Sequence, residues 1–101
     1  MQPLSGVRVL DLSRILAGPH ATQTLSDLGA EVLKLEAPWG DDTRSWGPPF
    51  QSGFDGEAVA SYFLSCNRGK RIETVNIKQE QARLRTLVSE FDVVVENFKP
   101  G

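Results

Sequence analysis

VRVLDLSRILAGPHATQTLSDLGAEVLKLE, residues 7–36, is the stretch that decides the fold. It begins with a largely apolar run at residues 7–12, which is typical of a buried strand in a parallel sheet. The residues that follow repeat an apolar side chain at helical spacing: Ala21, Leu25 and Leu28. Gly29 is a good helix stop, and a second apolar run follows at residues 31–36. The stretch therefore predicts a strand, a helix and a second strand.

The rest of the chain continues this alternation after an interruption. Residues 37–56 contain four Gly, three Pro and both Trp, so we expect a long, aromatic-rich, irregular loop. The apolar spacing from Val59 to Cys66 predicts a helix. A third strand is expected at residues 71–77, and a helix at about residues 79–90 leads to a fourth, β-branched strand at residues 92–96.

This order of elements predicts an α/β fold with a four-stranded parallel sheet. Right-handed crossovers would give a Rossmann-like sheet, most simply in the strand order 3-2-1-4. The sequence stops five residues after the fourth strand, and no helix follows to cover it. We therefore expect residues 1–101 to be the amino-terminal part of a larger Rossmann-like domain, incomplete at its C-terminal end.

Composition and charge restrict the classes of protein to which this chain could belong. The 101 residues are 40% hydrophobic and 24% charged, which is ordinary for a globular domain. Eleven basic residues against 13 acidic ones give a net charge of −2, which does not favour a nucleic-acid or anionic-membrane partner. No apolar run approaches the ~20 residues that span a bilayer, and no signal peptide is visible, so we expect a cytoplasmic protein. With one cysteine (Cys66) and one histidine (His20), we expect no disulfide framework and no metal site.

The strand ends predict where a ligand could bind. In open parallel sheets, ligands bind beyond the carboxyl ends of the strands. That rule selects residues 13–18, residues 36–44, Lys78 and residues 97–100. These segments offer cations, an amide and an aromatic ring: Arg14, Arg44, Lys78, Lys99, Asn97 and Phe98. A ligand with a phosphate and a flat ring would suit this set. Four unrelated, solvated loop ends are an equally good interpretation.

Familiar nucleotide motifs are absent. After the first strand the only glycines are Gly18 and Gly29, so there is no G-x-G-x-x-G turn for NAD or FAD, and the P-loop pattern is also missing. Core packing of Cys66 is a better interpretation than a nucleophilic pair with His20.

Three other features favour ordinary structural roles or leave the choice open. Asp41 and Asp42 are more readily interpreted as hydrated loop acids than as metal ligands. The basic run at residues 68–71 favours a solvated turn over a phosphate contact. Trp39 and Trp46 could stack on a ligand ring or cover the edge of the sheet, and the two interpretations are equally good.

Five strings occur together in a known order. They are GVRVLDLSR (6–14), LAGP (16–19), LGAEVLKLE (28–36), NRGKR (67–71) and VENFKPG (95–101). In this order the chain resembles the amino-terminal part of the family III CoA-transferases. That family includes formyl-CoA:oxalate and carnitine CoA-transferases and the α-methylacyl-CoA racemases.

The resemblance implies a Rossmann-like domain whose strand ends bind coenzyme A. Carried over by position, eight residues would contact CoA: Arg14, Ile15, Leu16, Ala17, Val75, Lys78, Asn97 and Phe98. Lys78 would be a phosphate-binding cation. CoA and acyl-CoA would be substrates, with no tightly bound cofactor.

The resemblance also implies an activity for the intact enzyme. Such an enzyme transfers CoA between carboxylic acids through enzyme-bound acyl and CoA intermediates, after an aspartate attacks the thioester. That aspartate would match a region beyond Gly101, so no residue here is assigned a catalytic role. The partners would be an acyl-CoA, a carboxylic acid and a second subunit in an interlocked homodimer. An acyl-CoA racemase and a non-catalytic CoA- or nucleotide-binding module are the alternatives. A receiver-like structural domain fits least, because the first loop carries Arg14 where an acidic cluster is expected.

Overall fold

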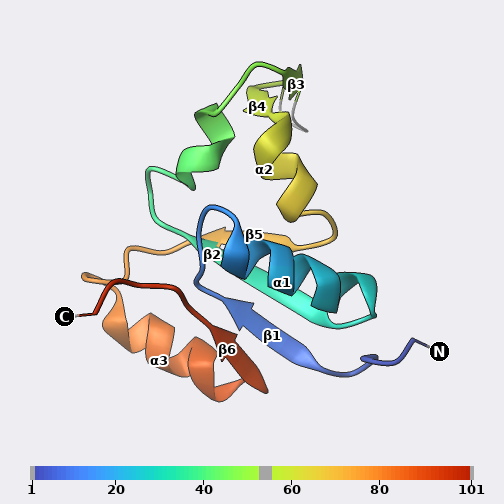
Figure 1. Ribbon diagram of the computed structural model, residues 1–101. Helices are drawn as coiled ribbons and strands as arrows, with labels where there is room; N and C mark the ends of the chain where they lie inside the picture. The colour runs from blue at the N-terminus through green and yellow to red at the C-terminus, as the bar shows by residue number, and fades with distance from the viewer. Residues whose placement is uncertain (1, 53–55, 101) are drawn as a thin grey trace.

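Four parallel strands form the main sheet, in the spatial order β5-β2-β1-β6 (Figure 1). They are β1 (Arg8–Asp11), β2 (Glu31–Glu36), β5 (Arg71–Thr74) and β6 (Val93–Val95). This computed structural model describes residues 2–52 and 56–100. Counted as the four predicted strands, the order is 3-2-1-4, so the predicted α/β class and strand order are confirmed.

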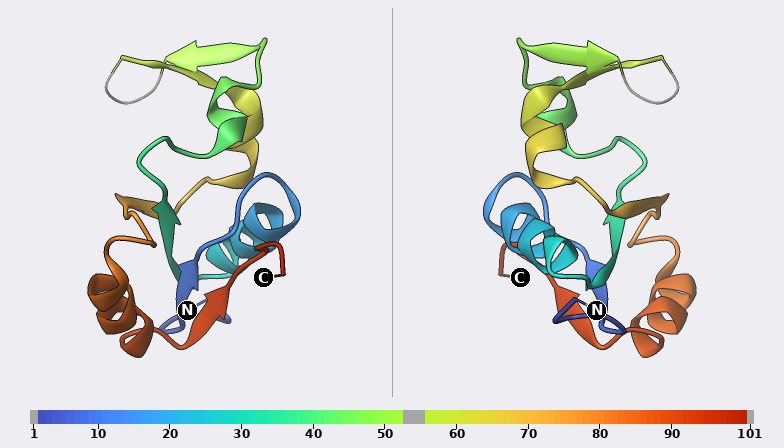
Figure 2. Two further views of the ribbon diagram at one scale, coloured as in Figure 1. Left: turned by 90° about the vertical axis from the view of Figure 1, so that its left-hand side faces the viewer. Right: turned by 90° about the vertical axis from the view of Figure 1, so that its right-hand side faces the viewer.

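Helices cover the two faces of this sheet. Figure 2 shows α1 (Ala17–Asp27) and α3 (Gln81–Ser89) on opposite sides of the strands. On one side a core of Leu10, Leu12, Leu33, Leu35 and Val75 packs against Leu84, Leu87 and Phe91, in and just after α3. On the other side the core is Val9, Ala30 and Val32, with Leu25 of α1 packed against it. Successive residues of a strand point to opposite faces, so apolar runs in β1 and β2 supply both cores.

The segment between β2 and β5 differs from the prediction. We expected an irregular loop at residues 37–56, but it contains a 3-10 helix, η1 (Asp42–Ser45), and a short strand, β3 (Phe50–Ser52). β3 pairs antiparallel with β4 (Ala58–Ala60), and residues 53–55 lie outside the described part of the chain. Val59, which we placed in a helix, therefore belongs to β4, and α2 (Ser61–Cys66) begins two residues later. Strands of three residues are too short to show an alternating pattern, which explains the error.

This segment stands beyond one edge of the main sheet (Figure 1). Its buried apolar residues are Val59, Ala60, Phe63 and Cys66. Cys66 is buried in α2, as expected for core packing, while His20 is exposed on α1. Within the described residues, no helix is long and apolar enough to cross a membrane.

Candidate functional site

A pocket of about 610 Å³ lies at the carboxyl ends of β1, β2 and β5. Apolar side chains from the strand ends form much of its wall, including Leu12, Leu35 and Val75. Loop residues that follow the strands complete it. The structure therefore has a cavity at the edge where parallel sheets bind ligands.

Four of the eight predicted site residues line this pocket: Arg14, Val75, Lys78 and Phe98. Asn97 does not line it but fixes the neighbouring loop, because its side chain accepts from the Arg14 N–H at 3.1 Å and donates to the Arg14 carbonyl at 2.9 Å. The structure thus brings residues from the first, third and fourth strand ends together, and their contact with CoA stays a prediction.

The other three predicted residues lie outside the pocket wall. Ile15 donates its N–H to an Asp41 carboxylate oxygen at 3.3 Å. Leu16 and Ala17 form the beginning of α1, where Leu16 is the N-cap residue. Contact between these three residues and a ligand stays a prediction.

Sequence reasoning selected residues 36–44 as a strand end that could bind a ligand, but it missed Lys34 and assigned no residue of this segment to the CoA site. Lys34, Glu36, Trp39 and Asp41 all line the pocket. Trp39 is 73% exposed, so its indole is available to a ligand at this site. The available signal was the position of residues 36–44 at a strand end, which selected the segment without showing how its charges pair.

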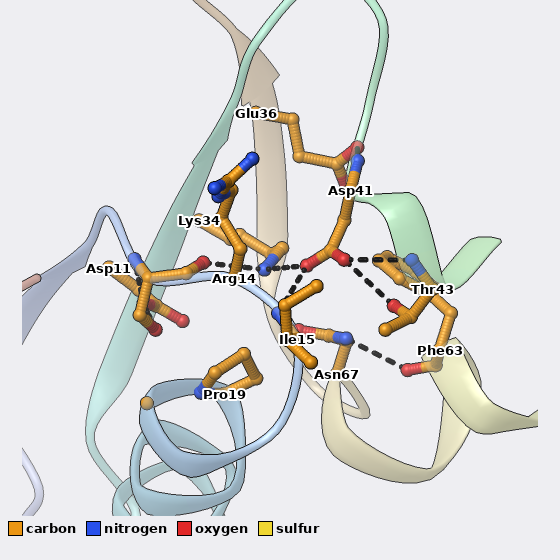
Figure 3. A network of polar contacts seen from close by, with 12 residues as sticks. Asp11, Arg14, Ile15, Pro19, Lys34, Glu36, Asp41, Thr43, Phe63 and Asn67 are labelled. Carbon is orange, nitrogen blue, oxygen red and sulfur yellow. Dashed lines mark hydrogen bonds and ion pairs between the residues drawn. The ribbon is translucent and has the colours of Figure 1, made fainter. Parts of the chain in front are cut away.

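Asp41 corrects one prediction directly. We expected Asp41 and Asp42 to be hydrated, and Asp42 is exposed, but Asp41 is only 4% exposed. Its carboxylate lies 3.1 Å from the Lys34 ammonium, and both side chains are almost completely buried (Figure 3). It also accepts from the Thr43 N–H at 3.0 Å and the Thr43 hydroxyl at 2.9 Å. Burial raises the pKa of Asp41, but the Thr43 N–H and the Lys34 charge outweigh it, so the pKa lies below its usual value.

The second carboxylate of the pocket is also engaged. Glu36 accepts two hydrogen bonds from Arg44, at 2.8 and 2.7 Å, and one from the Asp41 N–H at 3.0 Å. The Arg44 guanidinium lies 4.0 Å from the centre of the Phe63 ring. Arg44, which we considered as a cation for a ligand, is therefore part of a structural ion pair.

A second buried ion pair lies beneath the loop that follows β1. The Lys70 ammonium is 3.1 Å from the Asp11 carboxylate, and both side chains are fully buried. This corrects the interpretation of residues 68–71 as a solvated turn: Arg68 and Arg71 are exposed, but the Lys70 side chain is not.

Asp11 also organises the loop by hydrogen bonds. It accepts from the N–H and hydroxyl of Ser13 and from the Thr22 hydroxyl. Burial raises the pKa of Asp11, yet these bonds and the Lys70 charge bring it below its usual value. Burial lowers the pKa of Lys70, although the Asp11 charge opposes that change. Within the described ranges, no cluster of three or more His, Cys, Asp or Glu residues could hold a metal ion.

A parallel sheet with helices on both faces and a pocket at the carboxyl ends of its strands defines an α/β protein of the kind that binds ligands at that edge. Residues 4–101 match the model of CoA-transferase family III, and the chain belongs to that family. It is 54% identical over 104 residues to succinyl-CoA:glutarate CoA-transferase of Mus musculus, matching 100% of this chain and 23% of that protein. It is 50% identical over 103 residues to succinyl-CoA:mesaconate CoA-transferase of Haloarcula marismortui, matching 100% of this chain and 26% of that protein.

A solved structure agrees with these relatives. The crystal structure of a CAIB/BAIF family protein from Brucella suis superposes with a TM-score of 0.91 at 57% identity, over 97% of this chain and 26% of that one. The chain thus spans about a quarter of the length of the proteins that it matches.

Proposed function

We propose that this chain supplies part of the coenzyme A site of an enzyme that transfers CoA between carboxylic acids. The observation that carries the proposal is the strand-end pocket, where Arg14, Val75, Lys78 and Phe98 come together. Both relatives above are named for the transfer of CoA from succinyl-CoA to a dicarboxylic acid. Succinyl-CoA and a short dicarboxylate are therefore the substrates that we propose, in preference to racemisation of an acyl-CoA.

The pocket offers each part of CoA a suitable surface. Arg14 and Lys78 are cations that could pair with the phosphates. Trp39 and Phe98 present aromatic faces to the adenine ring. The apolar wall suits the pantetheine arm, which carries few charges. Residues 15–17, at the start of α1, would approach the ligand from the side of that helix.

The acidic groups of the pocket do not supply the nucleophile in this proposal. Glu36 is bound to Arg44 and Asp41 to Lys34, so both carboxylates already have buried or half-buried cationic partners. A nucleophile must reach the thioester carbon, and a carboxylate fixed in this way is a poor candidate. We therefore infer that residues 1–101 bind CoA as the amino-terminal part of a Rossmann-like domain, and that the reacting aspartate is not among them.

The proposal includes three properties of the intact enzyme. CoA enters as a substrate and not as a tightly bound cofactor, because the reaction moves it from one acid to another. The enzyme would act as an interlocked homodimer, as the family resemblance implies, and in the cytoplasm, where CoA esters are available.

Calorimetric titration of the chain with CoA tests the binding proposal. Lys78→Ala removes a pocket cation, and we expect it to weaken CoA binding by about fivefold to tenfold, the effect of one charge-assisted contact. Arg85→Ala is the matched control, because Arg85 is an exposed cation on α3 that does not line the pocket. Equal losses in the two variants would show that only net charge matters, and absence of CoA binding by the unaltered chain would refute the proposal.

A second assay tests the inference about the nucleophile. The 101-residue chain mixed with succinyl-CoA and glutarate should form no glutaryl-CoA. Formation of glutaryl-CoA by this chain would show that one of its own carboxylates attacks the thioester.

A further inference from the structure

The loop at residues 13–15 is fixed by side chains at almost every backbone polar group. Four side chains from separate parts of the chain take part: Asp11, Lys34, Asp41 and Asn97. Asp11 accepts from the Ser13 N–H at 2.9 Å, and Lys34 donates to the Ser13 carbonyl at 3.0 Å. Asn97 binds both backbone groups of Arg14, and Asp41 accepts from the Ile15 N–H. Because side chains bind nearly all the backbone polar groups of this loop, they hold its backbone in one conformation.

The backbone conformation of this loop is strained. Ile15 has φ +75°, and among the described residues it is the one non-glycine with a positive φ. A β-branched side chain strongly disfavours this left-handed conformation. Strain of this kind persists where surrounding contacts impose it, and it gathers at ligand sites.

The Lys34–Asp41 ion pair is the part of this network that spans the strained residue. Lys34 lies in the central strand β2, and its ammonium joins the Ser13 carbonyl to the Asp41 carboxylate (Figure 3). The same Asp41 oxygen accepts from Ile15 N–H, while the other oxygen is fixed by Thr43. The pair therefore binds the loop on both sides of Arg14, at Ser13 and at Ile15, and connects it to the inner strand β2.

We propose that Lys34 and Asp41 are positioning residues that hold the loop 13–15 in its strained conformation and so place Arg14 in the CoA pocket. This inference rests on the proposed function, because it assigns the pair a task in ligand binding as well as in folding. Without the pair, the Ile15 backbone relaxes to a negative φ and Arg14 leaves its binding position. The free energy needed to restore the strained loop then reduces ligand affinity.

A double-mutant cycle on CoA affinity tests this role. Asp41→Asn should weaken CoA binding about tenfold, the fold-change that corresponds to the strain of one left-handed β-branched residue. In an Ile15→Gly background the same Asp41→Asn change should cost about twofold or less, because glycine takes a positive φ without strain. An equal loss in both backgrounds would show a merely structural role and overturn the proposal.

Two further variants separate positioning from general stability. Leu25→Ala removes apolar packing against the core of Val9, Ala30 and Val32, which does not line the pocket, so it should lower the midpoint of thermal unfolding and leave CoA affinity unchanged. Ile15→Pro keeps the ion pair, but it fixes φ near −65° and removes the N–H. It should bind CoA far more weakly than Ile15→Gly, even if Asp41→Asn fails to fold. Similar affinities for these two Ile15 variants would overturn the proposal.

Hydrogen exchange distinguishes failure of this inference from failure of the proposed function. If the unaltered chain does not bind CoA, the proposed function fails, and exchange of the residue 15 amide then decides whether the pair holds the loop. Asp41→Asn should speed that exchange at least tenfold relative to the amides of β1, and unchanged exchange would overturn the inference.

Discussion

At the scale of single residues, the contact between Gly18 and Ser13 shows how closely α1 approaches the loop. A Cβ atom added at Gly18 would lie 2.2 Å from the Ser13 Cβ and 2.3 Å from its hydroxyl oxygen. Such distances require one group to move. The Ser13 side chain has little freedom to do so, because its hydroxyl is bound to the buried Asp11 carboxylate.

Gly18→Ala should therefore destabilise the protein, although alanine is the better helix former. Overpacking costs about 1–3 kcal/mol, which exceeds the gain of roughly 1 kcal/mol from helix propensity. Urea unfolding measures the change, with Thr24→Ala as a control at an exposed position of the same helix, where we expect a change within about 0.5 kcal/mol. A more stable Gly18→Ala variant would show that the loop and α1 are not in close contact.

At the scale of elements, the Asp11–Lys70 pair joins β1 to the turn that leads into β5. Lys70 lies 59 positions after Asp11 in the chain, and β2 lies between β1 and β5 in the sheet, so the pair is a long-range contact. Lys70 also donates to the Pro19 carbonyl at 3.0 Å and to the Asn67 side chain at 2.9 Å. One ammonium therefore connects β1, α1 and the end of α2.

Lys70→Met should destabilise the protein strongly, because it leaves the Asp11 carboxylate buried without its cation. Loss of one partner of a buried pair costs about 3–5 kcal/mol. Arg68→Met, two residues earlier, breaks the exposed pair with Asp27 and should cost less than about 1 kcal/mol. Chemical denaturation of both variants gives the comparison, and equal costs would show that the Asp11–Lys70 pair is not buried in solution.

The sequence predicted the main elements well because their signals are local. Apolar runs indicated the strands, and apolar residues at helical spacing, such as Leu84 and Leu87, indicated α3. The strand order followed from handedness, and the pocket position from the rule on strand ends. The short strands β3 and β4 were not predicted, because three residues are too few to show the alternation of apolar and polar side chains that indicates a strand.

The charge network could not be predicted in the same way. Asp41 and Lys70 look like solvated residues in their local sequence, and only the folded chain shows that Lys34 and Asp11 lie next to them. The positive φ of Ile15 could not be predicted from the sequence either, since isoleucine is among the residues least expected to adopt it. These positions, where local rules fail, adjoin the candidate site, which is where such conflicts are expected.

At the scale of the whole molecule, the buried carboxylates make stability depend on pH. Asp11 and Asp41 both have a pKa below the usual value of 3.8, because hydrogen bonds and lysine charges outweigh the effect of burial. The unfolded chain then binds protons more readily than the folded one in acid. The stabilisation from these two groups is complete above the unfolded pKa and is lost as the pH falls through the folded pKa values.

We therefore expect the free energy of unfolding to change little between about pH 7 and pH 5 and to fall steeply below about pH 4. Urea unfolding at a series of pH values measures this. Asp41→Asn should be less stable at neutral pH, and its stability should fall less on acidification, because one of the two carboxylates no longer titrates. The two proteins should then approach each other in stability in acid. Parallel pH profiles would show that Asp41 is not a charged, buried partner of Lys34 in the folded protein.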